Sequence, residues 1–104
     1  MSKKYFVLHL IPCRPDFAET MTNEERNIMH QHIGYWTEYM NKGVALVFGP
    51  VLDPKGTYGL GIIGVDDEEQ LTSFIENDPA GKINKYEYYP MHAIVPVNKT
   101  TLVQ

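Results

Sequence analysis

The spacing of apolar residues changes several times along the chain, and each change predicts a change of secondary structure. Short apolar runs predict strands, whereas apolar residues three and four positions apart predict a helix with one buried face. The segment between residues 12 and 21 fits neither pattern, holds two prolines and is expected to be a loop. The predicted strands are residues 5–11, 44–48, 58–65 and 86–97, and the predicted helices are residues 23 to 41 or 42 and about 67–77.

Capping residues define the ends of the first helix. Thr22 is a good N-cap, and Glu25 three residues later completes a capping box, in which each side chain accepts a hydrogen bond from the other residue's backbone. Gly43 suits the position just after the helix, where the chain commonly turns through the left-handed region. These signals predict one long helix between the first two strands.

Other turn-forming residues mark the remaining boundaries. Gly49-Pro50 is expected to stop the second strand, and Asp66, with Glu69 at the reciprocal position, is expected to cap the second helix. Asp78-Pro79 should break the chain after that helix, because the residue before a proline disfavours helical backbone. Pro90 interrupts the last strand, so alternation does not assign the faces of its residues.

The order of elements, β-α-β-β-α-β, predicts an α+β fold of the ferredoxin-like kind, a four-stranded antiparallel sheet with both helices on one face. We expect a single domain over residues 1–98 and a loose tail over residues 99–104. The first strand is apolar on both faces, so water is not expected on either face of the sheet. A second copy of the chain is the simplest cover, which predicts a homodimer whose sheets face each other and leaves higher assembly open.

Charge and composition narrow the possible partners. The 104-residue chain has 43% hydrophobic and 21% charged residues and a net charge of −4, with scattered lysines and arginines. Nucleic acids and anionic membranes are not expected as partners, because phosphate binding needs a concentrated basic face. No apolar run is long enough to cross a bilayer. The single cysteine, Cys13, forms no internal disulfide, and we expect a cytoplasmic protein.

Two histidines lie two residues apart in the stretch MHQHIGYW, residues 29–36. On the helical period His32 lies with the apolar face of the first helix, whereas His30 lies about 160° away around it. The pair therefore makes no metal site, because histidines that share a zinc ion on a helix are four residues apart. His32 is a candidate general base, and the alternative is a histidine at the core edge that bonds a backbone carbonyl.

A general base needs a group that orients it, and Asp78 is the candidate. Asp78 follows the second helix, and both helices are expected on the same side of the sheet, which brings its carboxylate toward the first helix. A carboxylate beside His32 would orient the ring and favour its protonated form. The alternative role for Asp78 is local turn chemistry before Pro79.

Two further features add no site of their own. The segment GLGIIG, residues 59–64, has the spacing of a dinucleotide fingerprint, but it lies inside a predicted strand and no phosphate-binding helix follows, so we reject that function. His9 and His92 lie in the first and last strands and either line a pocket or edge the sheet.

Residues 32–53, HIGYWTEYMNKGVALVFGPVLD, resemble the YciI-like family of small proteins. That family has a helix-1 histidine eleven residues before a helix-ending glycine and a Gly-Pro six residues after the glycine, and His32, Gly43 and Gly49-Pro50 fit this spacing. The later segment ENDPAG, residues 76–81, matches the Asp-Pro of the family. The resemblance covers residues 4–97, and Met29 departs from it, since many members have an arginine there.

The resemblance implies a dimeric α/β-barrel of ferredoxin-like subunits, with a site built from His32 and Asp78. Wider relatives include enzymes of the muconolactone-isomerase type that act on small aromatic compounds, and dehydrochlorinase-like proton transfer has been suggested for the family. We therefore expect a small-molecule enzyme of the isomerase or lyase type that acts on a small cyclic or aromatic substrate and needs neither metal nor cofactor. The residues expected to bind the substrate are His9, Arg14, Tyr35, Trp36 and Gly49, with Arg14 placed to meet an acidic group.

A non-catalytic dimer that binds or senses a small ligand is the alternative function. The same aromatic-rich pocket would hold the ligand without transforming it. A role for Cys13 or for bound haem in oxidative chemistry has less support, because haem needs an open axial histidine in an apolar cavity.

Overall fold

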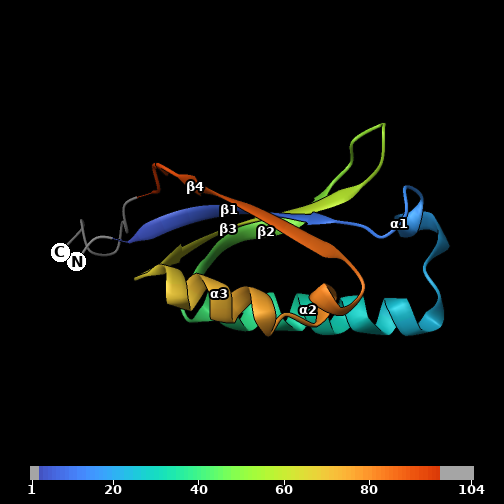
Figure 1. Cartoon of the computed structure of the whole chain (residues 1–104), viewed down its shortest axis with the longest axis horizontal. Coiled ribbons are helices and arrows are strands. Elements are labelled where there is room, and N and C mark those ends of the chain that lie inside the picture. The colour runs from blue at the N-terminus through green and yellow to red at the C-terminus, as the bar shows by residue number, and fades with distance from the viewer. Residues whose placement is uncertain (1–2, 97–104) are drawn as a thin grey trace.

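The computed structural model describes residues 3–96, and within them the elements follow the expected order (Figure 1). No helix among these residues is long and apolar enough to span a bilayer. The elements are β1 (Lys4–Ile11), α1 (Phe17–Thr20), α2 (Asn23–Asn41), β2 (Ala45–Val51), β3 (Tyr58–Val65), α3 (Glu68–Glu76), the short 3₁₀ helix η1 (Pro79–Lys82) and β4 (Lys85–Met91).

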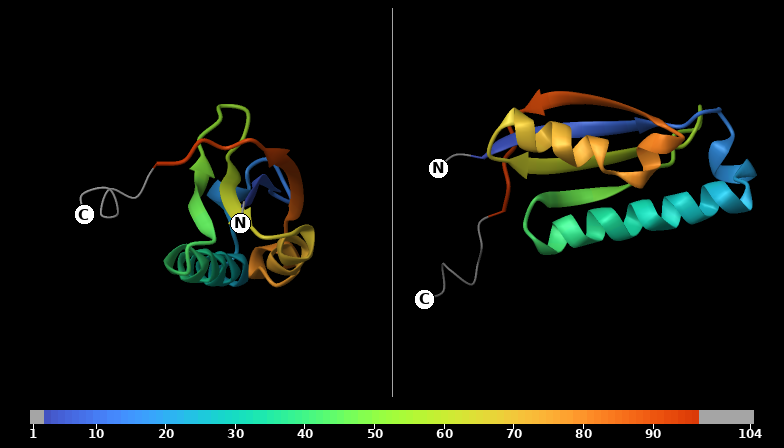
Figure 2. Two further views of the ribbon diagram at one scale, coloured as in Figure 1. Left: turned by 90° about the vertical axis from the view of Figure 1, so that its left-hand side faces the viewer. Right: turned by 60° about the horizontal axis from the view of Figure 1, so that its bottom comes forward.

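The four strands form one antiparallel sheet in the order β2-β3-β1-β4. The helices α2 and α3 lie side by side against one face of this sheet, as Figure 2 shows along the strands. The α+β fold class with a four-stranded antiparallel sheet is thereby confirmed. The predicted last strand, residues 86–97, is too long, because β4 ends at Met91 and residues 92–96 form no strand. The predicted tail, residues 99–104, lies outside the described residues.

The core lies between the sheet and the two helices. Residues of β1 alternate between buried positions, which face the helices, and partly exposed positions, which face the other way. From the helices, the buried side chains are Trp36 of α2 and Leu71 and Phe74 of α3. The sheet contributes Phe6, Leu8, Ala45, Ile63 and Val65.

Helix α2 begins and ends as its capping residues predict. The Thr22 side chain accepts a hydrogen bond from the backbone N–H of Glu25, and the Glu25 carboxylate accepts one from the backbone N–H of Thr22. After the helix, Gly43 has a φ of 83°, a left-handed conformation that side chains rarely adopt. The helix therefore has a fixed length, which sets the positions of the residues on its inner face.

Both edge strands contain a proline that was expected to end or interrupt them. Pro50 does not stop the second strand, because β2 continues through it and pairs it with Gly59. Pro90 lies inside β4 and pairs with Phe6. A proline lacks an N–H group to donate, and an edge strand tolerates this because one side of the strand has no partner in the sheet.

Two other boundaries differ from the sequence-based expectation. Helix α3 is capped by Asp67, whose carboxylate accepts from the backbone N–H of Gln70, and the Gln70 side chain accepts from the backbone N–H of Asp66. The N-cap is therefore Asp67, one residue after Asp66, the cap expected from the sequence. The segment expected to be a loop before α2 contains the short helix α1, whose Phe17 is buried.

The face of the sheet opposite the helices is largely apolar and uncovered. The register places Val7 beside both Ile62 and Tyr89, and Val47 beside Ile62. Val47 is 52% exposed and Tyr89 is 55% exposed. No helix of the described chain lies over this face (Figure 2).

Gly61 should be required for the packing of α2 on the sheet. A Cβ atom at Gly61 would lie 2.3 Å from Cη2 of Trp36 and 3.2 Å from Cβ of Phe48. We expect Gly61→Ala to lower the free energy of unfolding by about 2–3 kcal/mol, because the buried indole ring has to move. Urea unfolding measures this loss.

Gly34→Ala is the matched control, since it adds the same methyl group where no atom lies within 4 Å. Gly34 is exposed in α2, so alanine should raise the free energy of unfolding by about 0.5–1 kcal/mol. If Gly61→Ala is as stable as the wild type, the indole ring of Trp36 does not lie on Gly61.

Candidate active site

The candidate site lies where the inner face of α2 meets the turn between α3 and β4. Asp78, just before η1, faces His32 of α2, although the two residues are 46 positions apart in the chain. His32 Nδ1 lies 2.9 Å from Oδ1 and 3.0 Å from Oδ2 of Asp78. Asp78 is 3% exposed, so this pair is shielded from solvent on the carboxylate side.

Three further donors surround the Asp78 carboxylate. Trp36 Nε1–H donates to Oδ2 at 2.8 Å, and the hydroxyl of Tyr86 donates to the same oxygen. The backbone N–H of Ala80 donates to Oδ1 at 2.9 Å, which makes Asp78 the N-cap of η1. Both oxygens of this buried group are therefore hydrogen-bonded, as a buried carboxylate requires.

These donors decide the charge of Asp78. Burial alone would raise the pKa of its carboxyl, but the hydrogen bond and charge of His32 and the hydrogen bonds from Tyr86 and Ala80 outweigh burial, so the pKa lies below its ordinary value. Burial, together with the nearby Asp78 charge, raises the pKa of Tyr86 well above its usual range. Tyr86 therefore keeps its proton and serves as a donor to an ionised carboxylate.

An ionised carboxylate only accepts hydrogen bonds, so the proton between the two side chains is carried by His32 Nδ1. In the neutral ring the other nitrogen, Nε2, is then unprotonated and available as an acceptor. No hydrogen bond to Nε2 is found within residues 3–96. The Asp78 contact thus fixes both the orientation and the tautomer of the imidazole.

The ring of His32 forms part of the wall of an apolar cavity of about 410 Å³. This cavity lies between the first half of α2, the inner face of the sheet and the segment that carries α1. Pockets of this size hold small organic ligands. Its apolar wall residues include Leu8, Leu10, Phe17, Met21, Met29, Trp36, Phe48 and Pro50.

Two of the expected substrate-binding residues, Trp36 and Gly49, lie in this wall together with His32. Trp36 contributes one face of its ring to the core and its Nε1–H to Asp78. Gly49 lies in β2, where a Cβ atom would meet nothing within 4 Å. The structure therefore brings His32, Asp78, Trp36 and Gly49 into one region of the molecule.

Two other expected pocket residues lie elsewhere. His9 is on the uncovered face of the sheet, where its ring centroid is 4.3 Å from that of Tyr58. The hydroxyl of Tyr35 donates to the backbone carbonyl of Phe74 at 2.8 Å, which places Tyr35 between α2 and α3. Neither His9 nor Tyr35 lines the cavity.

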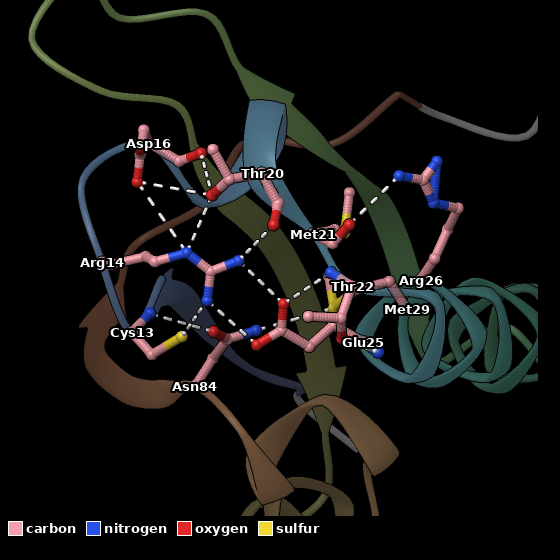
Figure 3. A network of polar contacts seen from close by, with 10 residues as sticks. All are labelled: Cys13, Arg14, Asp16, Thr20, Met21, Thr22, Glu25, Arg26, Met29 and Asn84. Carbon is pink, nitrogen blue, oxygen red and sulfur yellow. Dashed lines mark hydrogen bonds and ion pairs between the residues drawn. The ribbon is translucent and has the colours of Figure 1, made fainter.

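Arg14 is also absent from the cavity wall, and a network of polar contacts shows why (Figure 3). Its guanidinium donates to both carboxylate oxygens of Glu25, at 2.8 and 3.0 Å. It also donates to the side chain and the backbone carbonyl of Thr20, at 2.8 and 2.7 Å. Arg14 thus ties the segment before α2 to the first turn of that helix.

Tyr86 is the residue of the site that the sequence did not single out. It lies in β4 opposite Leu10, so it points to the helix side of the sheet, and its ring lines the cavity. The signal for it was weak, because Pro90 obscures the alternation of the last strand. Among the described residues, no group of three or more His, Cys, Asp or Glu is arranged to hold a metal ion.

The stability of the protein should depend on pH through Asp78. Because folding lowers its pKa, the ionised carboxylate contributes fully above the pKa of an unfolded aspartate, about 4, and the contribution is lost as the pH falls through the lower folded value. Asp78→Asn lacks this contribution. The difference between its free energies of unfolding at about pH 7 and about pH 3, measured in urea, should therefore be smaller than in the wild type.

The control is Asp66→Asn, which neutralises an exposed carboxylate that pairs with Lys3 at 3.3 Å. This variant should retain most of the wild-type difference, because an exposed ion pair adds little stability. Equal differences in the wild type and in Asp78→Asn would show that Asp78 is not held as an anion.

Comparison with known proteins agrees with this fold. The chain is similar to the crystal structure of SnoaB, a cofactor-independent oxygenase from Streptomyces nogalater, with 10% sequence identity and a TM-score of 0.50. The similarity covers 93% of this chain and 98% of the SnoaB chain, and at this identity it shows the fold alone. No significant match is found among curated proteins.

The family assignment rests on the sequence. Residues 5–94 match the YCII-related domain. This range contains the helices and, apart from Lys4, the strands of the sheet. The YciI-like resemblance of residues 32–53 is thereby confirmed. The chain belongs to the family of YCII-related domain proteins.

Proposed function

We propose that the protein is a small-molecule enzyme in which His32 and Asp78 act as a dyad for general acid–base proton transfer. One observation carries this proposal: the His32 ring is fixed at Nδ1 by a buried carboxylate, while the same ring borders an apolar cavity. A base needs this combination of a fixed orientation and a free nitrogen beside a substrate. The family and the fold are compatible with such an enzyme.

In the proposed reaction, Nε2 of His32 takes a proton from an acidic C–H or O–H group of a cyclic or aromatic substrate. The electron pair of the broken bond forms a new double bond in the substrate. In an isomerisation the proton returns at another carbon, and in an elimination a leaving group such as chloride departs with its electron pair. The imidazolium that forms is stabilised by the Asp78 carboxylate, 2.9 Å from Nδ1.

Trp36 and Tyr86 are positioning residues in this proposal. Both donate hydrogen bonds to Oδ2 of Asp78, and they come from different elements, α2 and β4. They keep the carboxylate ionised and aimed at His32, because rotation of the carboxylate would leave a buried donor unpaired. Metals and cofactors have no role in this scheme.

A non-catalytic dimer that binds a small ligand is the second candidate. The observation that favours it is that Asp78 also has a structural task, since it caps η1 and joins α2 to β4 through Trp36 and Tyr86. His32 would then complete a packing network, and the cavity would hold a ligand without transforming it.

The proposed functional unit is a homodimer whose two sheets face each other. The uncovered apolar face, with Val7, Val47, Ile62 and Tyr89, supports this arrangement. A monomer rarely leaves such a contiguous apolar surface in water. A cytoplasmic location stays a prediction of the sequence.

Replacing His32 should abolish proton transfer without abolishing binding. The assay follows conversion and deuterium exchange of small cyclic ketones, lactones and phenols in D₂O by NMR. For any compound that the wild type converts, we expect His32→Asn to lower the rate by about 10²–10⁴-fold, because a positioned general base contributes an acceleration of that size. Calorimetric titration with the same compound measures binding separately.

His30→Asn is the matched control, because it makes the same substitution on an exposed residue of the same helix. It should keep the wild-type rate. Conversion that persists in His32→Asn would contradict the proposed dyad. Binding of compounds that the wild type never converts would favour the ligand-binding dimer.

Placing a charge on the uncovered face of the sheet should break the dimer. Light scattering after size exclusion should give the wild type a mass of about twice the 11.9 kDa chain. Val47→Glu should give the mass of one chain, because a buried unpaired carboxylate is costly at an apolar interface. Gln31→Glu, on the exposed side of α2, should stay dimeric, and a monomeric wild type would exclude the proposed assembly.

A further inference from the structure

The cavity beside His32 has an unusual charge distribution for a site that would bind an anion. Of the residues in its wall, none in the described chain is lysine or arginine. The wall contains one acidic residue, Glu19, which lies in α1 and is exposed. A carboxylate or phosphate group of a ligand would thus find no fixed cation.

The chain has two arginines, Arg14 and Arg26, and both make contacts within the protein (Figure 3). Every nitrogen of the Arg14 guanidinium has a partner in Thr20 or Glu25, and its hydrogen bonds lower the pKa of Glu25 to about 2, so the pair stays ionised. Arg26 donates to the backbone carbonyl of Met21 at 3.2 Å. Using Arg14 for a ligand would require breaking its contacts, and Arg26 is exposed and does not line the cavity.

The inner end of the cavity also carries a negative charge behind its wall. The Asp78 carboxylate is ionised and lies directly behind His32. An anion beside His32 would lose its hydration and would be repelled by this charge, whose screening by water is small in the interior.

Few polar groups remain to bind a ligand. The side chain of Asn84 is partly used, since it accepts from the backbone N–H of Cys13 at 3.2 Å and donates to Sδ of Met29 at 3.5 Å. Tyr86 gives its hydroxyl proton to Asp78. Nε2 of His32 is therefore the main polar group at the inner end of the wall. The rest of the wall is mostly apolar or aromatic, and its other polar side chains are Glu19, Thr57 and Asn84.

We propose that this cavity takes an uncharged, largely apolar ring compound that presents one weakly acidic proton to His32, and that it rejects carboxylates and phosphates. The part of this inference that concerns the acidic proton rests on the proposed function. The part that concerns charge rests on the cavity wall alone. A volume of about 410 Å³ accommodates a compound with one or two fused rings.

The test uses two naphthalene probes that share a ring system and differ in charge: 2-naphthylmethanol and 2-naphthoate. Isothermal titration calorimetry of the wild-type protein at about pH 7 should show binding of the alcohol, and the carboxylate should bind at least about tenfold more weakly, because the cavity wall offers it no lysine or arginine. A carboxylate that binds within tenfold of the alcohol would overturn the inference. Failure of the alcohol to bind would also overturn it.

A charge placed in the wall should reverse this preference. Met29 is half-buried, lines the cavity and lies one helical turn before His32. Met29→Lys should bind 2-naphthoate at least about tenfold more tightly than the wild type does, because the ammonium group supplies the missing partner. Met29→Gln has a side chain of similar length without the charge and should not gain affinity.

The variants also separate the charge of the wall from its shape. Failure of Met29→Lys to gain affinity for the carboxylate, or an equal gain in Met29→Gln, would overturn the explanation by charge. Calorimetry needs no turnover, so tight carboxylate binding would overturn the neutral-ligand inference and leave the His32 dyad standing. If the His32→Asn assay contradicts the proposed dyad, the predicted charge selectivity of the cavity still stands.

Discussion

The buried carboxylate of Asp78 is the group on which the site and its surroundings depend. Its two oxygens accept hydrogen bonds from His32, Trp36, Ala80 and Tyr86, which come from α2, η1 and β4. The positions of these three elements are therefore coupled through one charge. Leaving that charge unpaired in the interior would be costly, so the native arrangement is favoured over any that separates the donors.

The same charge links the packing of the protein to its proposed chemistry. It fixes the His32 ring with Nδ1 inward, and it makes the inner end of the cavity unfavourable for a second anion. One group thereby determines both how the base is aimed and which ligands can approach it. A chain of 104 residues has room for only one core, so the same buried group contributes to both packing and the proposed chemistry.

The sequence predicted local features well and failed where the answer depended on distant neighbours. The first helix was predicted to within one residue because its capping box, apolar period and final glycine agree. Pro50 and Pro90 were misjudged because only the assembled sheet shows that both lie on edge strands. His32 and Asp78 were identified as candidates. Tyr86 was not, because Pro90 prevented the alternation of residues along β4 from being assigned.

The packing of Trp36 against Gly61 fixes the place in the protein from which its tryptophan fluorescence comes. Trp36 is the only tryptophan of the chain, it is 2% exposed, and its ring forms part of the cavity wall. The indole emission of the whole protein therefore comes from one place, beside the His32 ring at a centroid distance of 6.2 Å. The wild-type protein carries its own fluorescent reporter of whether the cavity is wet, dry or filled.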